Sequence, residues 1–329
     1  MKEALLFAIG DVRVVESPKP KITDDEILVA VRSCGVCPTD ARKFKTGDHG
    51  VPSWPFNMGH EWTADVAEVG RNVKKWKVGQ RVAVTSYGGY AEYVKIGPEE
   101  LEPGQRAIDS LLELPDSVTY EEGTFVEPLA DAIHSVVDQA RVSIGDRLVI
   151  VGAGQLGLQH LMVAKTLGAR VLVSDMVESR LTAAKEFGAD VVVRPDKEDA
   201  AAAVKEWTQG KGADAVVVAA GAAKAAEQAL LMVRKAGRVV LFAGFEGHQT
   251  MSFDPNILHY GEIILTGSYW VGVRPNSNIG LYSRALELIE SKQTPVGKLV
   301  THRYGLADLR PALEKVMSKD GLKVMINVK

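Results

Sequence analysis

Residues with metal-binding side chains stand at widely separated positions in the sequence: Cys37, the adjacent pair His60 and Glu61, and Glu127. A catalytic zinc ion takes about three protein ligands from sulfur, nitrogen and oxygen donors, and keeps one position open for water or substrate. Each residue alone has a simpler explanation, since a lone cysteine is usually a small buried hydrophobe and a glutamate before proline is often a helix N-terminal charge. Together they predict a zinc site, in which Gly59 permits the irregular turn that lets His60 and Glu61 bind one ion.

The sequence contains two cysteines, Cys34 and Cys37. A redox dithiol, half of a four-cysteine zinc knuckle, and one metal ligand beside one buried thiol are the alternatives for such a pair. Counting excludes the four-cysteine site within one chain. The redox alternative normally requires a strand-to-helix step, whereas here the strand-like run Glu26–Val31 leads into a mixed segment after Pro38, which disfavours it.

A glycine-rich segment follows the apolar run Leu148–Val151 and opens a helical pattern; its members are Gly152, Ala153, Gly154, Gln155, Leu156 and Gly157. Gly152 permits a tight turn, Gly154 lets the backbone approach a pyrophosphate, and Gly157 lets the helix pack closely on the strand. The N–H groups at the start of the helix, from Gln155 and Leu156, point at phosphate. The segment therefore predicts a dinucleotide site.

The next strand-like run ends in Asp175, 18 residues after Gly157. An acid at this place accepts hydrogen bonds from the adenosine ribose hydroxyls. A 2′-phosphate would place like charge beside Asp175, so the sequence favours NAD over NADP. Arg180 follows nearby and is positioned to cover the adenine, while the simpler role for Asp175 is to cap the helix that starts near Glu178.

Two regions with different secondary-structure patterns predict two domains. Residues 1 to about 125 hold short β-like runs separated by Gly, Pro and Asp, and residues from about 145 to 270 alternate apolar strands with helical patterns, which is typical of βαβ units around a parallel sheet. We expect an α/β protein with a β-rich catalytic domain, residues 1–126 and 272–329, and a doubly wound dinucleotide-binding domain, residues 127–271. The expected strands of the second domain are Arg147–Val151, Arg170–Ser174, Val191–Val193, Ala215–Ala219, Arg238–Phe242 and Ile263–Leu265.

Composition restricts the possible partners. The net charge of −3 over 329 residues gives no reason to expect nucleic acid or an anionic membrane as partner. No segment offers about 18 uninterrupted apolar residues, so we expect no membrane span and a cytoplasmic protein. The edge strand Ile263–Leu265 suits pairing between copies of the chain across a two-fold axis.

The order of motifs resembles the zinc-dependent medium-chain dehydrogenase family, and the resemblance covers essentially the whole chain. Its most specific members are the segment Cys34–Asp40, reading C-G-V-C-P-T-D, the G-H-E of Gly59–Glu61, and the G-G-Y-A-E-Y of Gly88–Tyr93. Glu68–Val82 is similar to the E-V-G and G-Q-R-V elements of the family. Glu127–Leu129 and the tail Thr301–Met325 resemble the sorbitol (polyol) dehydrogenase branch.

The resemblance implies a GroES-like catalytic domain beside a Rossmann domain, and a polyol, secondary alcohol or sugar-type substrate oxidised with NAD. It also implies a homodimer or homotetramer. It implies that Cys37, His60 and Glu61 are the zinc ligands. Glu127 would be a fourth ligand or hold the zinc-bound water, and Thr39 would begin the proton relay. Cys34 does not carry over as a ligand, and we expect it to be buried packing.

The sequence departs from the family pattern at two places. The lobe with four cysteines that holds a structural zinc is absent, because the chain runs Thr85-Ser86-Tyr87 where it would stand, so we expect one zinc per chain. A relay histidine of the family is replaced by Arg42, followed by Lys43. These cations either lie on a solvated helix face or bind a phosphate or carboxylate of the substrate through Arg42.

Further candidates and alternatives stay open at this point. Trp54, Phe56 and Trp270 are candidate walls of a substrate cleft, although each is as well explained as core. Two other functions suit the same fold: a zinc-free quinone or enoyl reductase, which would lack the cysteine and G-H-E set, and a non-catalytic NAD-binding protein, which would not need it.

Overall fold

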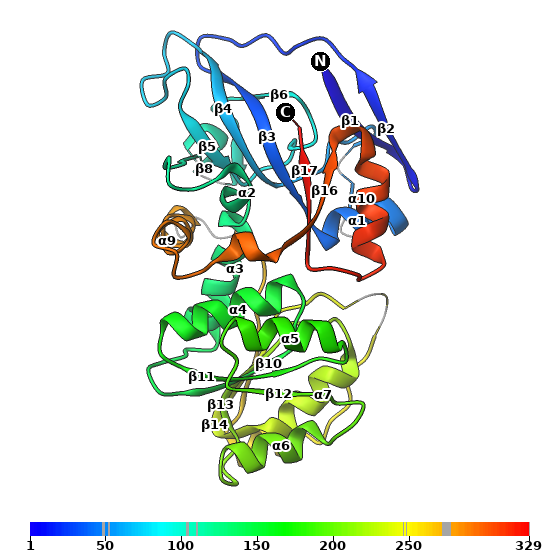
Figure 1. The fold of residues 1–329 in the computed structure, drawn as a ribbon, viewed down its shortest axis with the longest axis vertical. Coiled ribbons are helices and arrows are strands. Elements are labelled where there is room, and N and C mark those ends of the chain that lie inside the picture. The colour runs from blue at the N-terminus through cyan, green and yellow to red at the C-terminus, as the bar shows by residue number, and fades with distance from the viewer. Residues whose placement is uncertain are drawn as a thin grey trace. The chain divides into compact units, whose positions relative to one another are not determined.

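The computed structural model describes residues 1–47, 50–51, 53–102, 105–109, 111–245, 247, 249–271 and 278–328 (Figure 1). The chain forms two compact units: unit 1 comprises Met1–Glu127 and Gly272–Lys329, and unit 2 comprises Pro128–Val271. Each unit has its own sheet and its own hydrophobic core. Over the described residues, no helix is long and apolar enough to cross a membrane.

Unit 1 is built on a seven-stranded sheet in the order β16-β17-β3-β4-β5-β9, with β6 pairing β3. The longest strand, β3, is almost continuously buried because its residues are apolar on both faces. The strands of this sheet are β3 (Ile27–Val36), β4 (Glu61–Val69), β5 (Arg81–Val84), β6 (Tyr93–Ile96), β9 (Leu112–Glu113), β16 (Val300–Gly305) and β17 (Lys323–Asn327). Two hairpins lie beside it: β1 (Lys2–Ala8) with β2 (Asp11–Glu16), and β7 (Glu100–Glu102) with β8 (Gln105–Arg106).

The register of two strand pairs brings distant segments together at one end of β3. Gly35 pairs with Glu61 of β4 on one side and with Met325 of β17 on the other. Because neighbouring strands lie about 4.8 Å apart, this register places the carboxyl-terminal tail beside the segment that carries the cysteines. The carboxyl-terminal strand therefore belongs to the centre of unit 1, as Figure 1 shows.

Helices complete unit 1. They are α1 (Pro38–Thr46), α2 (Tyr120–Gly123), α9 (Asn278–Glu290) and α10 (Leu309–Met317), with short 3₁₀ turns η1 (Ala107–Asp109), η4 (Val296–Leu299) and η5 (Leu306–Asp308). The boundary between the units falls within α3 (Val126–Ile133), which continues as a π-helical turn, η2 (His134–Gln139). The segment after Pro38, expected to be mixed, is helical, because Pro38 occupies the first turn with a preset φ and Gly47 ends the helix at φ +73°.

Unit 2 is a six-stranded parallel sheet in the order β12-β11-β10-β13-β14-β15. Its strands are β10 (Arg147–Val151), β11 (Arg170–Ser174), β12 (Val191–Val193), β13 (Ala213–Val218), β14 (Val233–Leu241) and β15 (Ile264–Gly267). Its helices are α4 (Gln155–Thr166), α5 (Glu178–Glu186), α6 (Ala200–Trp207), α7 (Ala223–Met232) and α8 (Asn256–Gly261). Figure 1 shows α4 and α5 along one face of the sheet and α6 and α7 along the other.

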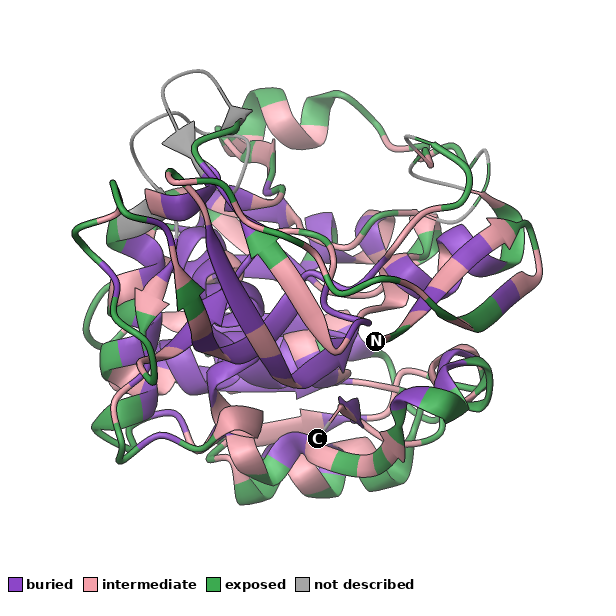
Figure 2. Ribbon diagram, turned by 90° about the horizontal axis from the view of Figure 1, so that it is seen from above, coloured by how far each residue is buried: buried purple, intermediate pink, exposed green. Residues whose placement is uncertain are grey.

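The expected strands of unit 2 are all present. β10, β11 and β12 have the expected bounds, whereas β14 begins at Val233 rather than Arg238, because Val233 pairs with Ala213 before the register shifts. Ile264 lies in the edge strand β15, as the sequence predicts. Figure 2 shows buried residues concentrated in the strands and on the inner faces of the helices, with exposed residues on the outer turns.

Candidate metal centre and dinucleotide site

Cys37 is positioned by the junction between β3 and α1. It follows Val36, the last residue of the strand, and its backbone forms the N-cap of the helix with φ −84° and ψ 145°. Asp40, in the first turn of α1, is fully buried and accepts a bond of 3.5 Å from the Cys37 N–H. The strand-to-helix junction therefore holds the thiol at a defined place. Cys34, on the strand itself, is fully buried among apolar residues, as expected for packing.

His60 and Glu61 reach the same place from the other side of β3. Gly59 has φ +79°, a left-handed conformation that a side chain disfavours, and an added Cβ would lie 2.9 Å from the Cys34 sulfur. This turn directs His60 and Glu61 to Cys37: one ligand atom from each of the three lies within 4.8 Å of the others. The structure thus brings together the sulfur, nitrogen and oxygen donors that the sequence singled out.

A buried aspartate, itself bonded to a buried tyrosine, lies beside the imidazole of His60. The His60 Nδ1 lies 3.5 Å from Asp40 Oδ1, and the Asp40 carboxylate also accepts from the Tyr90 hydroxyl at 2.8 Å and the Gly59 N–H at 3.4 Å. Burial lowers the pKa of His60, but Asp40 and Cys37 outweigh it and hold that pKa well above its ordinary value. Burial raises the pKa of the Cys37 thiol, and Glu61 adds to the effect. The field at this site thus favours a positive charge among the donors.

Lys323, from β17, is the cation that the sequence did not single out. Its ammonium donates to Glu61 Oε2, and both side chains are 1% exposed. An added Cβ at Gly35 would lie 2.4 Å from Glu61 Oε2 and 2.7 Å from Lys323 Cε, so the absence of a side chain at Gly35 creates the space for this pair. Burial lowers the pKa of Lys323, and the carboxylate of Glu61 more than offsets this effect.

Glu127 is buried in the first turn of α3 and is not a member of the group of three ligand atoms. Burial raises its pKa to about 7; the charges of His60 and Lys323 act to lower that pKa and the charge of Glu61 to raise it. Glu127 is therefore close enough to feel the charges of the site. This burial and this sensitivity to charge suit both roles that the sequence predicts for Glu127, a fourth ligand or a group that holds a water molecule.

Helix α1 presents three further candidates. Thr39 is half-buried in the first turn, two residues after Cys37. Arg42 is half-buried, whereas Lys43 is buried, donates to the Gly50 carbonyl, and lies 5.6 Å from the Tyr87 ring centroid and 5.8 Å from that of Phe56. The Tyr87 ring in turn packs edge-on against His60, with centroids 5.2 Å apart.

The loop Thr85-Ser86-Tyr87 contributes contacts to this site. Its Tyr87 ring contacts both the imidazole of His60 and the ammonium of Lys43, and its Ser86 carbonyl accepts from the indole of Trp62 at 2.6 Å. Burial lowers the pKa of Lys43, and Asp40 partly offsets that effect. Of the two cations that the sequence singled out on α1, Arg42 and Lys43, the structure shows Lys43 against the rings beside His60.

The candidate wall residues divide into different environments. Phe56 packs on Tyr87 with centroids 5.1 Å apart and so lies near the metal site. Trp54 is 47% exposed, and Trp270, in unit 2, is half-buried with its indole N–H buried and unpaired among the described residues. Phe56 is the wall candidate that these contacts support within unit 1.

In unit 2, the glycines of the segment between β10 and α4 occupy the conformations expected for a phosphate loop. Gly152 has φ +104°, and an added Cβ at Gly157 would lie 1.9 Å from the Gly152 carbonyl oxygen, so neither position accepts a side chain. Gly154 is the N-cap of α4, and an added Cβ there meets nothing within 4 Å. The backbone at Gly154 is thus open to approach, and the following residues, Gln155 and Leu156, begin the helix.

Asp175 ties this loop to the next strand. Its Oδ2 accepts from the Ala153 N–H at 2.7 Å and its Oδ1 from the Val177 N–H at 2.8 Å, while Arg180 Nη1 lies 4.0 Å from Oδ2. The N-cap of α5 is Val177, so Asp175 bonds the residue that begins the helix rather than capping it directly. Gln155 is buried and accepts from Gln159 at 2.6 Å, so its side chain serves the packing of α4.

The three donors fit a zinc ion. Thiolate, imidazole and carboxylate are all zinc ligands. The structure gathers one ligand atom of each kind within 4.8 Å of the others, so small side-chain shifts bring the three to one ion. The His60 Nδ1 is buried and has no hydrogen-bond partner within 3.5 Å among the described residues, apart from the Asp40 oxygen at that limit. Such an arrangement is typical of a zinc-bound imidazole whose other nitrogen faces a carboxylate.

Comparison with known proteins gives the same reading of both units. Residues 23–137 match the alcohol dehydrogenase GroES-like domain, and residues 156–291 match the zinc-binding dehydrogenase domain. D-arabitol-phosphate dehydrogenase of Enterococcus avium is 33% identical, with 93% of this chain and 91% of that protein covered. Sorbitol dehydrogenase of Bombyx mori is 32% identical over 99% of this chain and 98% of that protein.

A solved structure is similar in fold over the whole length of the chain. The (2R,3R)-butanediol dehydrogenase of Bacillus subtilis superposes with a TM-score of 0.88, at 26% identity, over 100% of this chain and 99% of that one. The expected pairing of a GroES-like domain with a Rossmann-like parallel-sheet domain is confirmed, and the zinc-free and non-catalytic alternatives are set aside. The chain belongs to the zinc-dependent medium-chain dehydrogenases, and it is an oxidoreductase that acts on CH–OH groups of alcohols and polyols.

Proposed function

We propose that this dehydrogenase oxidises a secondary hydroxyl of a polyol that carries a phosphate, with NAD as the hydride acceptor. The main support for this oxidation reaction is the convergence of Cys37, His60 and Glu61, whose ligand atoms lie within 4.8 Å of one another. A zinc ion held there supplies Lewis acidity, which lowers the pKa of a bound hydroxyl. The D-arabitol-phosphate dehydrogenase among the relatives makes a phosphorylated polyol a natural candidate.

The residues around the donors have separate tasks in this proposal. Asp40 and Tyr90 hold the imidazole and so keep the ligand set in one geometry. Thr39, half-buried two residues after Cys37, takes the hydroxyl proton towards solvent, and Glu127, buried beside the charges of the site, orients the hydroxyl or a water molecule.

The phosphate is assigned to Lys43. Its ammonium lies 5.6 Å from the centroid of the Tyr87 ring, which also packs on His60, so an anion at Lys43 lies near the ligand set. The neighbouring Phe56 and Tyr87 restrict water around the ammonium, which strengthens its attraction for a phosphate. Arg42 is the second candidate for the same phosphate, since it lies on the same helix.

A matched pair of cysteine variants tests the metal part. In Cys37→Ser, bound zinc measured by elemental analysis and NAD reduction with a panel of polyols and polyol phosphates both fall to background, while NAD binding stays measurable. Cys34→Ala, which removes the buried neighbour, keeps one zinc per chain. Full activity of a metal-free protein contradicts the mechanism.

Lys43→Met and Arg42→Met test the phosphate. If Lys43 binds the phosphate, Lys43→Met raises KM for the phosphorylated polyol roughly ten- to hundredfold, which is the affinity that one charge-assisted hydrogen bond contributes. The KM for the unphosphorylated polyol stays unchanged. An equal rise for both substrates shows that Lys43 only supports the loop at Gly50, to which it donates. The same selective effect in Arg42→Met alone moves the assignment to Arg42.

NAD rather than NADP, a cytoplasmic location and a homo-oligomer belong to the same proposal. Asp175 disfavours a 2′-phosphate by its charge, and both cysteines are free thiols, which suits a reducing compartment. Exposed apolar residues near the edge strand β15 support pairing between copies, since Ile264 is 44% exposed and Tyr269 69%. Ile264→Lys lowers the mass measured by sedimentation if β15 forms that interface, and an unchanged mass excludes it.

A further inference from the structure

A basic pocket lies at the edge of the unit 2 sheet opposite the glycine-rich loop. It has a volume of about 450 Å³ and is lined by the residues at which the parallel strands begin: Gly145, Arg147, Arg170, Lys211, Gly212, Asp214 and Arg234. The glycine-rich loop follows the carboxyl end of β10, whereas Arg147 is the first residue of that strand. The pocket is therefore separate from the dinucleotide site of the same unit.

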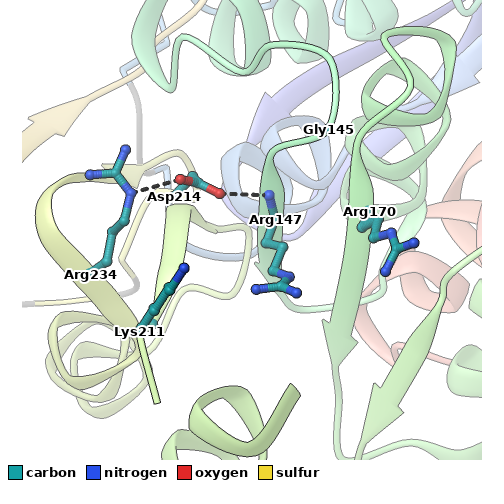
Figure 3. A pocket seen from close by; sticks show the side chains of 7 residues that line it. Gly145, Arg147, Arg170, Lys211, Asp214 and Arg234 are labelled. Carbon is teal, nitrogen blue, oxygen red and sulfur yellow. Dashed lines mark hydrogen bonds and ion pairs between the residues drawn. The ribbon is translucent and has the colours of Figure 1, made fainter. Parts of the chain in front are cut away.

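The single carboxylate among the lining residues, Asp214, already accepts hydrogen bonds from the protein. Asp214 Oδ1 accepts from Arg234 Nε at 2.6 Å, and Oδ2 accepts from the Arg147 backbone N–H at 2.8 Å, as the dashed lines of Figure 3 mark. These bonds and the charge of Arg147 offset the burial of Asp214 and lower its pKa, so the carboxylate is ionised. Asp214 thus forms its direct ion pair with Arg234, and it reaches Arg147 through the backbone N–H and by a longer-range charge interaction.

Arg147 and Arg170 stand at directly paired positions on adjacent parallel strands. Paired residues project from the same face about 4.8 Å apart, and like charges in that arrangement repel. Figure 3 shows Arg147 and Arg170 on adjacent strands, with both side chains on the lining of the pocket. Among the described residues, no carboxylate lies within ion-pair distance of Arg147, Arg170 or Lys211. The charge of Arg170 does act on the carboxylate of Asp190, whose pKa it helps to lower. That carboxylate, however, already pairs with Lys165 at 2.9 Å and accepts from the Val171 N–H at 2.7 Å.

We propose that this pocket binds a small anion carrying two adjacent phosphate groups. Two neighbouring guanidinium groups offer planar, bidentate donors to two neighbouring phosphates, and Lys211 adds a third positive charge from the turn before β13. The volume lies within the about 300–1,000 Å³ of small-ligand pockets. A bound dianion would relieve the repulsion between Arg147 and Arg170, for which the described residues supply no direct ion pair.

The test is an isothermal calorimetric titration, in which inorganic pyrophosphate is added to the enzyme saturated with zinc and NAD. Saturating NAD occupies the phosphate site at Gly154, so the signal reports a different site. Trp207 supplies a local readout, because the Arg147 Cζ lies 5.9 Å from its ring, and its fluorescence change disappears in Trp207→Phe. We expect one pyrophosphate per chain and weaker binding of orthophosphate.

Arg147→Gln and Arg170→Gln are each expected to weaken pyrophosphate binding about tenfold or more, the value of a charge-assisted hydrogen bond. Arg284→Gln, an exposed arginine of α9 in unit 1, carries the same charge change and leaves the binding unchanged. Arg170 is exposed, so its variant folds even if that of Arg147 does not. Equal weakening in all three variants, loss of binding when NAD is present, or no saturable binding overturns the proposal.

Discussion

The ammonium of Lys323 donates to the carboxylate of Glu61, and this pair joins the carboxyl-terminal strand to the metal centre. Glu61 is therefore shared between a cation of the protein and the ion that the donor set fits. Since both charges are buried, removal of either leaves the other without compensation. Loss of Lys323 is therefore expected to make the stability of unit 1 depend on the ion.

This dependence predicts the behaviour of Lys323→Met. Without zinc, the variant is destabilised by about 3–5 kcal/mol, because Glu61 is left as an uncompensated buried charge. With zinc, the ion neutralises Glu61 and restores part of the loss, so the zinc-induced rise in unfolding temperature is larger in the variant than in the parent. Differential scanning calorimetry with and without chelator measures both.

Lys95→Met is the matched control for that experiment. Lys95 pairs with Glu26 at 2.9 Å but is 52% exposed, so its removal costs less than about 1 kcal/mol and does not respond to zinc. A deficit in Lys323→Met that zinc leaves unchanged would show that the two residues are coupled only through packing.

Glu127 is predicted to act beside the metal rather than on it. Glu127→Gln keeps the shape of the side chain and retains one zinc per chain, while kcat falls about tenfold or more, since an ionisable group near the reacting hydroxyl is lost. Zinc content and kcat measured on the same preparation separate these effects, with Glu113→Gln, an exposed neighbour on β9, as control. Loss of zinc from Glu127→Gln would make Glu127 a ligand.

Asp175 is predicted to set the choice of dinucleotide. Asp175→Asn keeps an oxygen that accepts from the Ala153 N–H but removes the charge, so the ratio of kcat/KM for NADP to that for NAD rises about tenfold. Asp196→Asn, another carboxylate of unit 2 that pairs with an arginine, leaves the ratio unchanged. The same ratio in both variants and the parent would exclude a role for Asp175.

The buried His160 predicts an acid sensitivity of unit 2. Its side chain packs on Phe242 with centroids 4.4 Å apart, and burial lowers its pKa from 6.5 to about 4, although the Leu156 carbonyl acts against this. Because the unfolded chain takes up the proton first, the stabilising contribution is complete above about pH 6.5 and is lost as the pH falls towards 4. That shift corresponds to about 3 kcal/mol.

Urea unfolding of the parent and of His160→Gln between pH 7 and 4.5 checks this account. The variant is less stable at pH 7, but its stability declines less steeply over the interval. His259→Gln, which changes an exposed histidine of α8, follows the parent curve. Parallel curves for His160→Gln and the parent would assign the acid sensitivity to other groups.

The parallel sheet, the glycine-rich loop and Asp175 were predictable from the sequence, because they depend on short-range patterns. An apolar strand, a glycine with positive φ and a following helix lie within a few residues of one another, and local sterics determine their conformation. The donor types Cys37, His60 and Glu61 were equally visible, since zinc accepts those ligands and few others. Their convergence was an inference from resemblance until the structure placed them together.

Other features depended on tertiary structure alone. Lys323 reaches Glu61 because β17 pairs with β3, and no local pattern in the tail signals a pairing across most of the chain. Lys43 rather than Arg42 faces the rings beside His60, since the direction of a side chain on α1 is set by how the helix packs. The juxtaposition of Arg147 and Arg170 likewise arises from strand register, which brings together residues that the sequence separates by a whole helix. Side-chain chemistry and local conformation can be read along the chain, whereas long-range pairing and burial decide which charges meet.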